Sequence, residues 1–305
     1  MDLTLIVVVV AVGLQQAVTV GLAAQGELLS EKSGILNIGL EGVMLMSAFS
    51  AAYANWFFES RVGLLSPAIA LLIGLVVGMA ANLFFSFVST KLQVDQVIAG
   101  IGVNIFAGGI TIVATIANFQ SFDSTPLANQ LPALFSIPGM ASTGSVSILE
   151  VGMFIIPVLM YLLLRRTTFG LHVRAVGENP KAAEAAGLDV AKTRILATTI
   201  GGALLGLAGA NLSVILSNYF VRSMTRGLGF IALAAVIAGA WSPIWVLGLS
   251  VLFGMSWGVY VQFNSTQGYT FLFGSLPYLV TVVVLALAST RLRPPAALAT
   301  PYKKE

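Results

Sequence analysis

Apolar runs as long as a membrane-spanning helix follow one another along almost the whole of this sequence. They occupy residues 3–24, 34–58, 66–90, 94–118, 148–164, 195–217, 244–262 and 269–290, and a shorter run occupies residues 227–240. Roughly 20 apolar residues in a helix cross the hydrocarbon core of a bilayer. Only 9% of the residues are charged, against roughly 25% in soluble domains. We therefore predict an all-α polytopic membrane protein that forms a single domain over residues 1–305, with about nine (8–10) transmembrane helices. The run at residues 227–240 is short for a span, so a re-entrant segment is its alternative.

The distribution of Lys and Arg residues predicts how the chain is oriented. With residues 165–194 and the C-terminus in the cytoplasm, 12 of the 15 Lys and Arg residues lie inside, as the positive-inside rule requires. The net charge of +3 is then a signal of topology and predicts no nucleic-acid partner. We expect the chain in the cell membrane, with its N-terminus outside and its C-terminus in the cytoplasm.

Two polar stretches are expected to lie outside the membrane. Residues 119–147 contain no Lys or Arg, which favours an external loop, with room for a short helix on the surface. Residues 291–305 are rich in proline and in basic residues, which predicts an unfolded cytoplasmic tail.

The longest polar interval, residues 165–194, has the features of a short docking helix. Asn179 can cap a helix, Pro180 suits the first helical position, and Gly187 can adopt the left-handed conformation that ends it. The segment between them, KAAEAA, has one to two turns and is too short to be stable alone. We interpret residues 165–194 as a cytoplasmic coupling loop whose helix fits a groove on a partner protein. The alternative is a solvated connector that is basic because of topology.

Glycines and polar residues interrupt the second apolar run near its start. Gly34, Gly39 and Gly42 lie there with Asn37 among them, a pattern that predicts a broken helix, which a membrane tolerates only where it is buried or lines a cavity. Glu41 follows, and an ionisable residue inside a span is a functional candidate by default. The alternative is that Glu41 only caps backbone donors and holds the broken helix in place.

Amide side chains within the apolar runs are the other candidates for a solute path. The polar groups expected in the membrane, apart from Glu41, are Gln15, Gln16, Asn37, Asn82, Asn104 and Asn211. The predicted path comprises Gln16, Asn37, Glu41, Asn104 and Asn211. Uncharged amides suit neutral solutes rich in hydroxyl groups. By contrast, the four-residue spacings of Gly74 with Gly78 and of Gly202 with Gly206 favour close helix packing.

The residue types limit the chemistry that this chain can perform. There is no cysteine and only one histidine, His172, so we predict no metal site. We also expect no pair of carboxylates on one helix face, which makes an intramembrane enzyme the least favoured class, with no catalytic residue. No GxxxxGK[ST] phosphate-binding sequence occurs. We therefore expect no cofactor on this chain, and energy from ATP would have to come through a partner.

Two segments resemble the permease subunits of ABC importers of the ribose and simple-sugar branch. They are SEKSGILNIGLEGVMLMSAF, residues 30–49, and RRTTFGLHVRAVGENPKAAEAAGLDV, residues 165–190. The chain is most similar to the shorter permease of nucleoside importers, over nearly its whole length. The resemblance implies a second, longer permease subunit as partner, a cytoplasmic ABC ATPase that uses the ATP, and an extracytoplasmic substrate-binding lipoprotein.

The resemblance also assigns residues and a solute class. It places docking on the ATPase at Arg174, Gly177, Glu178, Asn179, Pro180, Ala183, Glu184, Ala185, Ala186 and Gly187. The chain departs from the broader importer pattern, because Glu184-Ala-Ala is followed at once by Gly187, so contacts from other importer classes are not transferred. The implied solute is a nucleoside or a related simple sugar. The alternative function is an ion-coupled secondary transporter with Glu41 as its ion site.

Overall fold

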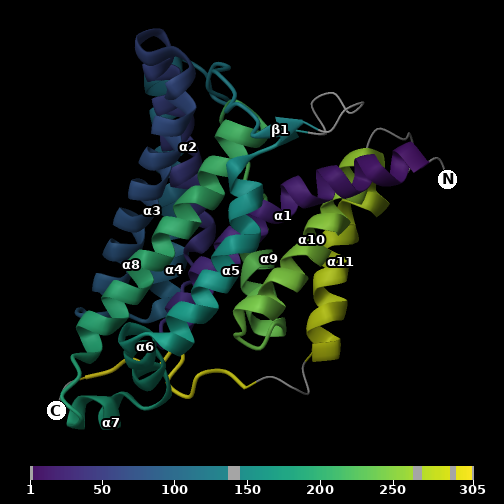
Figure 1. The fold of residues 1–305 in the computed structure, drawn as a ribbon. Coiled ribbons are helices and arrows are strands. Elements are labelled where there is room, and N and C mark those ends of the chain that lie inside the picture. Colours follow the sequence, from purple (N-terminus) through teal and green to yellow (C-terminus); the bar gives the residue numbers. More distant parts are fainter. Residues whose placement is uncertain (1–2, 137–144, 264–269, 289–292, 304–305) are drawn as a thin grey trace.

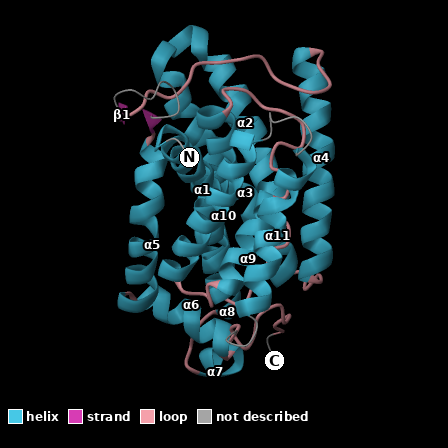
Figure 2. Cartoon of the chain, turned by 90° about the vertical axis from the view of Figure 1, so that its right-hand side faces the viewer, coloured by secondary structure: helices cyan, strands magenta, loops and turns pink. Residues whose placement is uncertain are grey.

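Helices make up most of the described chain, and the long ones run between two opposite ends of the molecule (Figures 1 and 2). The computed structural model describes residues 3–136, 145–263, 270–288 and 293–303. We call the end that carries helix α7 (Pro180–Ala185) the α7 end and the end that carries strand β1 (Phe135–Ser136) the β1 end. The N-terminus lies towards the β1 end and the C-terminus lies at the α7 end (Figure 1).

The remaining elements follow in chain order. They are α1 (Leu3–Lys32), α2 (Leu40–Val62), the 3-10 helix η1 (Gly63–Leu65), α3 (Ser66–Thr90), α4 (Gln96–Phe119), β2 (Ser145–Val146), α5 (Ile148–Arg166), α6 (Thr168–Glu178), α8 (Val190–Ala210), the π-helix η3 (Asn211–Leu216), α9 (Leu228–Ala238), α10 (Pro243–Phe263) and α11 (Thr270–Ala288). The predicted limits of the last helix, residues 269 and 290, and both ends of the predicted tail, residues 291–292 and 304–305, lie outside the described residues.

Six helical stretches among the described residues are long and apolar enough to cross a membrane, which supports a multi-pass membrane protein. One of them contains both α2 and α3, and two shorter apolar helices, Leu228–Ala238 and Phe273–Ala288, do not reach this length. Helix α9 has 11 residues and rises about 16 Å, roughly half the hydrocarbon thickness of a bilayer. The short apolar segment is therefore confirmed, whereas the number of about nine spans stays a prediction.

Helix α1 is longer than predicted. It continues to Lys32 instead of ending at residue 24, although its last turns contain Gln25, Glu27 and Glu31. All three of these polar side chains are buried. The helix therefore continues through this polar stretch. Neighbouring helices enclose the polar side chains, which were expected to lie in water.

Helix α6 was not predicted, and helix α8 begins earlier than expected. The Thr167 hydroxyl accepts a 3.0 Å hydrogen bond from the N–H of Gly170 and caps α6. The Asp189 carboxylate accepts a 2.9 Å bond from the N–H of Lys192 and caps α8. Both bonds satisfy backbone donors that a helix start leaves free, so the polar loop is mostly helical.

Helices α3 and α8 cross at a contact made by glycines. A Cβ atom on Gly78 or Gly202 would collide with the carbonyl oxygen of the other, and a Cβ atom on Gly206 would collide with that of Gly74. Small residues at this spacing let two helix backbones approach closely. The predicted packing role of these glycines is confirmed.

The loop at the β1 end is held by backbone hydrogen bonds. Strands β1 and β2 pair antiparallel, and the N–H of Thr125 donates to the carbonyl oxygen of Phe220 over 3.1 Å. The described part of residues 120–147 contains no helix, so the short surface helix is not found there. Residues 137–144 lie outside the described residues.

The C-terminal segment, residues 293–303, packs against the α7 end, so the prediction of an unfolded tail was wrong. Ala297 is buried and its N–H donates to the carbonyl oxygen of Gly177 over 2.9 Å. The N–H of Ala299 donates to the carbonyl oxygen of Gly34 over 3.2 Å. Composition alone misses this, because the partners are backbone carbonyls of distant segments.

Candidate functional site

The chain passes from α1 to α2 through an irregular turn, residues 33–39, which we call the α1–α2 break. Gly34 has a φ angle of +91°, a conformation that residues with a Cβ atom rarely adopt. The predicted broken helix is therefore confirmed. Polar backbone groups inside a membrane need partners within the protein, so the side chains that contact this break form the candidate site.

Asn104 of α4 holds the start of α2 with both ends of its amide. Its Oδ1 accepts a 2.7 Å hydrogen bond from the N–H of Gly42, and its Nδ2 donates to the carbonyl oxygen of Ile38 over 3.0 Å. The first bond satisfies an N–H group in the first turn of α2, which has no partner within the helix.

Asn37 connects the break to three helices. Its N–H donates to Oε1 of Glu27 on α1 over 2.9 Å, and its Nδ2 donates to Oδ1 of Asn82 on α3 over 3.0 Å. The Nδ2 of Asn82 in turn donates to the carbonyl oxygen of Thr198 on α8 over 3.0 Å. All of these groups are buried, so Asn37, alone among the amides predicted for the path, belongs to a hydrogen-bonded series that joins α1, the break, α3 and α8.

Glu41 contacts the start of α9. Its Oε1 accepts a 2.7 Å hydrogen bond from the N–H of Gly227 and its Oε2 accepts a 2.8 Å bond from the N–H of Gly229. A carboxylate at a helix N-terminus is stabilised by these donors and by the helix dipole. The geometry thus favours the structural alternative for Glu41, with a partner on a distant helix.

Two predicted path residues lie away from the break. Asn211 is buried at the start of η3 and its Nδ2 donates to Oγ1 of Thr19 over 2.9 Å. Gln16 is half-buried in α1, three positions before Thr19. The structure therefore brings three of the five predicted residues together at the break and leaves these two closer to the middle of α1.

Two buried carboxylates on α1 were missed by the sequence analysis. Glu27 and Glu31 are four residues apart, which places them on one helix face, and both are fully buried. The expectation that no two carboxylates share a helix face was wrong, because the first helix was expected to end before them. Their four-residue spacing was the signal that could have revealed the pair.

These carboxylates support the α1–α2 break and the turn before α10. Glu31 accepts a hydrogen bond from the indole N–H of Trp241, and Glu27 accepts the bond from Asn37 described above. One oxygen of each, Oε2 of Glu27 and Oε1 of Glu31, has no hydrogen-bond partner among the described residues. Because both carboxylates are fully enclosed, a substrate cannot reach them in this conformation.

Helix α7 forms where the sequence predicted it. The Asn179 Oδ1 accepts a 3.0 Å hydrogen bond from the N–H of Ala182, Pro180 is the first helical residue, and Gly187 has a φ angle of +88°. Each of these features acts within a few residues, which is why the sequence was sufficient to predict them.

Only one side of α7 is free to contact another molecule. The exposed members of the predicted docking set are Glu178, Asn179, Ala185, Ala186 and Gly187. Its buried or half-buried members are Arg174, Gly177, Pro180, Ala183 and Glu184. Ala183 packs against Val176 and Val190 in a small apolar cluster, so this side of α7 is attached to α6 and α8.

Arg194, whose charge was counted only as a topology signal, links the C-terminal segment to the break. Its side chain is 1% exposed, its Nε donates to the carbonyl oxygen of Ser33 and its Nη1 to that of Thr300, both over 3.1 Å. Two residues further along the chain, the Tyr302 hydroxyl donates to the carboxylate of Glu184 on α7. A series of hydrogen bonds therefore runs from α7 through the C-terminal segment to the α1–α2 break.

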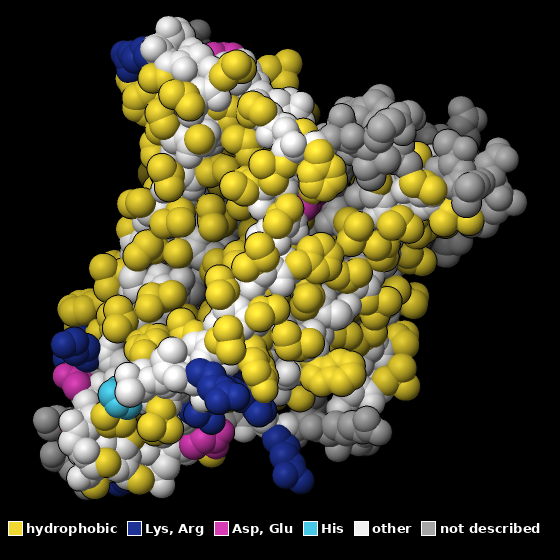
Figure 3. Space-filling view, in the orientation of Figure 1, with side chains coloured by type: hydrophobic (Ala, Val, Ile, Leu, Met, Phe, Trp, Pro, Cys, Tyr) yellow, Lys and Arg dark blue, Asp and Glu magenta, His cyan; other side chains and the backbone are white. Residues whose placement is uncertain are grey.

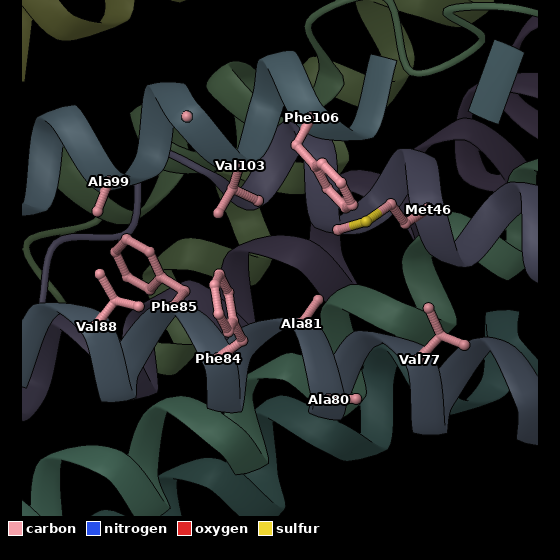
Figure 4. Close-up of a pocket in the computed structure, with 11 residues that line it drawn as sticks. Met46, Val77, Ala80, Ala81, Phe84, Phe85, Val88, Ala99, Val103 and Phe106 are labelled. Carbon is pink, nitrogen blue, oxygen red and sulfur yellow. The ribbon is translucent and has the colours of Figure 1, made fainter. Parts of the chain in front are cut away.

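A groove of about 610 Å³ lies between α3 and α4. Figure 4 shows Phe84 and Phe85 on one side of it and Val103 and Phe106 on the other, with Met46 at one end. Each of its described lining residues is apolar, and the Phe84 and Phe106 side chains are 64% and 61% exposed. A solute rich in hydroxyl groups would find no hydrogen-bond partner in this groove, so it is not a candidate for the path.

Comparison with a family model adds to this geometry. The model described as "Branched-chain amino acid transport system / permease component" matches residues 9–288. No solved structure matches the chain.

Several curated proteins similar to this chain are named as ABC transporter permeases. The guanosine ABC transporter permease protein NupQ of Bacillus subtilis is 31% identical, over 97% of each chain. The nucleoside ABC transporter permease protein NupC of Lactococcus lactis is 29% identical over 86% of each chain. The putative glucose ABC transporter permease protein TsgC13 of Haloferax volcanii is 30% identical, over 95% of this chain and 96% of its own. Bacillus subtilis and Lactococcus lactis each have a second permease that is similar to this chain. The match covers 65% of the length of NupP from Bacillus subtilis and 64% of the length of NupB from Lactococcus lactis.

Proposed function

This chain belongs to the family described as branched-chain amino acid transport system, permease component, and from that premise we propose that it is a permease subunit of an ATP-driven ABC importer for a nucleoside or a related simple sugar. The names of the similar NupQ, NupC and TsgC13 proteins support this class of solute. Nucleosides and sugars carry ring hydroxyl groups, which the uncharged amides of the candidate site can bind.

The hydrogen-bonded connection between α7 and the α1–α2 break is the observation that carries the proposal. Glu184 of α7 is bonded to Tyr302, and Arg194 bonds the carbonyl oxygens of Thr300 and Ser33. The backbone bond from Ala299 to Gly34 runs in parallel. A displacement of α7 would therefore act directly on the break.

The break in turn is connected to the helices that would have to move. Asn37 bonds α3 and α1 through Asn82 and Glu27, and Glu41 bonds the start of α9. We infer that an ATPase bound to the exposed side of α7 would shift the break, and the helices bonded to it, between two conformations. It could do so because its contacts with α7 would differ between the two conformations.

We propose that the path is closed in this conformation, because the amide side chains at the break are bonded to other groups of the protein. Asn37, Asn82 and Asn104 each use their side-chain amide within the protein. A solute passing the break would have to replace these bonds with bonds to its own hydroxyl groups. This exchange would favour neutral solutes with several hydroxyl groups over apolar ones.

We also propose the partners and the orientation of the chain. We place the α7 end in the cytoplasm, since Figure 3 shows Lys and Arg side chains gathered mainly at that end of the visible face. ATP hydrolysis would occur on a separate ATPase, and a substrate-binding lipoprotein would deliver the solute at the β1 end. The longer NupP and NupB proteins support a second, longer permease as the other half of the pathway.

Binding of the ATPase to the exposed side of α7 can be tested with Ala185→Arg. Ala185 is exposed, and arginine is nearly as good a helix former as alanine, so the helix should persist while the long side chain blocks docking. The measurement is co-purification of the ATPase with the tagged permease. Ala133→Arg is the matched control, because Ala133 is an exposed alanine near β1, at the opposite end.

We expect Ala185→Arg to lose the ATPase and uptake while the second permease stays bound, and Ala133→Arg to keep the ATPase. Retention of the ATPase by Ala185→Arg at the wild-type level would mean that α7 is not the docking helix. An ion-coupled transporter is the alternative, and it requires uptake that resists ATP depletion and stops when the ion gradient is collapsed.

A further inference from the structure

A cavity of about 360 Å³ lies at the α7 end, where α1, α5, α6 and the turn before α10 meet. Its lining includes Lys32 at the end of α1, Arg165 near the end of α5 and Arg174 in the middle of α6. Among its described lining residues Glu178 is the one carboxylate. The walls therefore carry three positive charges and one negative charge.

The positive side chains of this cavity are close enough to affect one another. Among the charges that Lys32 experiences, Glu178 acts most strongly, followed by Arg174, Arg165 and then Glu31. The carboxylates attract Lys32 and the two arginines repel it, since like charges held together in a partly buried site are unfavourable. The Nε of Arg174 is buried and has no hydrogen-bond partner among the described residues. A buried donor without an acceptor is unfavourable, so this cavity would be stabilised by an anion.

The cavity lies at the depth where lipid headgroups lie. Lys32 is the last residue of one candidate span, Arg165 is next to the last residue of another, and Pro243 begins a third. Within these spans, the surface next to the cavity is apolar: Leu162 of α5 is 45% exposed, and Trp245 of α10 is 72% exposed. Exposed tryptophan is typical of the membrane interface.

We infer that this cavity binds the phosphate-bearing headgroup of an anionic phospholipid, with the acyl chains along the exposed apolar sides of α5 and α10. Figure 3 shows hydrophobic side chains directly above the Lys and Arg side chains that lie over the lower end of α5. Arginine forms strong, bidentate hydrogen bonds with phosphate. Basic pockets between transmembrane helices on the cytoplasmic side are known to suit such headgroups. The cavity adjoins the α1–α2 break at Lys32, but the inference does not depend on which solute is carried.

The test is lipid retention by the purified full-length chain, measured by native mass spectrometry with phosphatidylglycerol and phosphatidylcholine at equal concentrations. We expect the wild type to prefer phosphatidylglycerol by about tenfold or more, and Arg165→Gln to lose roughly tenfold in its affinity, as for one charge-assisted bond. Arg166→Gln is the matched control, since Arg166 is also exposed and follows Arg165 directly but does not line the cavity. It should bind like the wild type.

Three results would overturn the inference. Equal retention of the two lipids would mean that the cavity does not recognise the anionic headgroup. An equal loss in Arg165→Gln and Arg166→Gln would mean that only the general surface charge matters. Displacement of phosphatidylglycerol by an equal concentration of inorganic phosphate would mean that the cavity takes a free anion. Because Arg165 is exposed, its variant should fold, and a thermal unfolding curve checks this.

Discussion

The carboxylate of Glu41 accepts a 2.7 Å hydrogen bond from the backbone N–H of Gly227, 186 positions later in the chain. Its other oxygen accepts the N–H of Gly229, so one side chain satisfies two free donors at the start of α9. The start of α2 and the start of α9 are thereby held together. A group that satisfies distant backbone donors has a structural role whatever its part in transport.

Replacing Glu41 by glutamine should destabilise the protein. The amide has one oxygen and one NH₂ group, so it can accept from one of the two N–H groups and its NH₂ group opposes the other. It also lacks the charge that the helix dipole stabilises. We expect a loss of about 1–3 kcal/mol in stability, seen as a lower apparent unfolding temperature in detergent.

Glu59→Gln serves as the control for this change, because Glu59 is half-buried near the other end of α2. It should leave the unfolding temperature close to that of the wild type. If Glu41→Gln were as stable as the wild type but had lost uptake, Glu41 would act in transport and not as a cap of α9.

Adding one methyl group at the contact between α3 and α8 should have a large effect. A Cβ atom on Gly206 would collide with the carbonyl oxygen of Gly74, and overpacking of this kind costs about 1–3 kcal/mol. Gly206→Ala should therefore lower the unfolding temperature and the yield of membrane-inserted protein. Gly102→Ala in α4 is the control, since no atom lies within 4 Å of its added Cβ. A normal Gly206→Ala protein would show that the two helices can separate at no cost.

Removal of the hydrogen bond between Tyr302 and Glu184 tests whether the C-terminal segment transmits movement from α7 to the break. Tyr302→Phe removes the hydroxyl but keeps the ring, so the ATPase should still co-purify while solute uptake falls several-fold. Tyr219→Phe, at a half-buried tyrosine nearer the β1 end, should leave uptake unchanged. Wild-type uptake by Tyr302→Phe would mean that the C-terminal segment does not transmit the movement of α7.

Much of the fold could be predicted from short-range features. The limits of α3 at residues 66 and 90 were predicted correctly, and so were the cap, start and end of α7. The broken helix before α2 followed from its glycines, of which Gly34 has the expected positive φ angle. In each case the cause lies within a few residues of its effect.

The candidate site was predicted only in part. The selection of Asn37, Glu41 and Asn104 as candidates followed from their polarity within apolar runs, and the structure brings them together at the break. Glu27 was missed because a polar stretch was taken for the end of a helix. The chain alone does not show that other helices enclose that stretch.

The sequence by itself determined that this chain crosses the membrane several times, where α3 and α7 lie, and that its second apolar run is broken. These features depend on the length of apolar runs and on hydrogen bonds between near neighbours. Only the tertiary structure decided that Glu41 caps α9, that Arg194 is buried between Ser33 and Thr300, and that the C-terminal segment is ordered. The physical reason is that a buried polar group must be satisfied by whichever segment packs beside it, and the packing of distant segments decides which one that is.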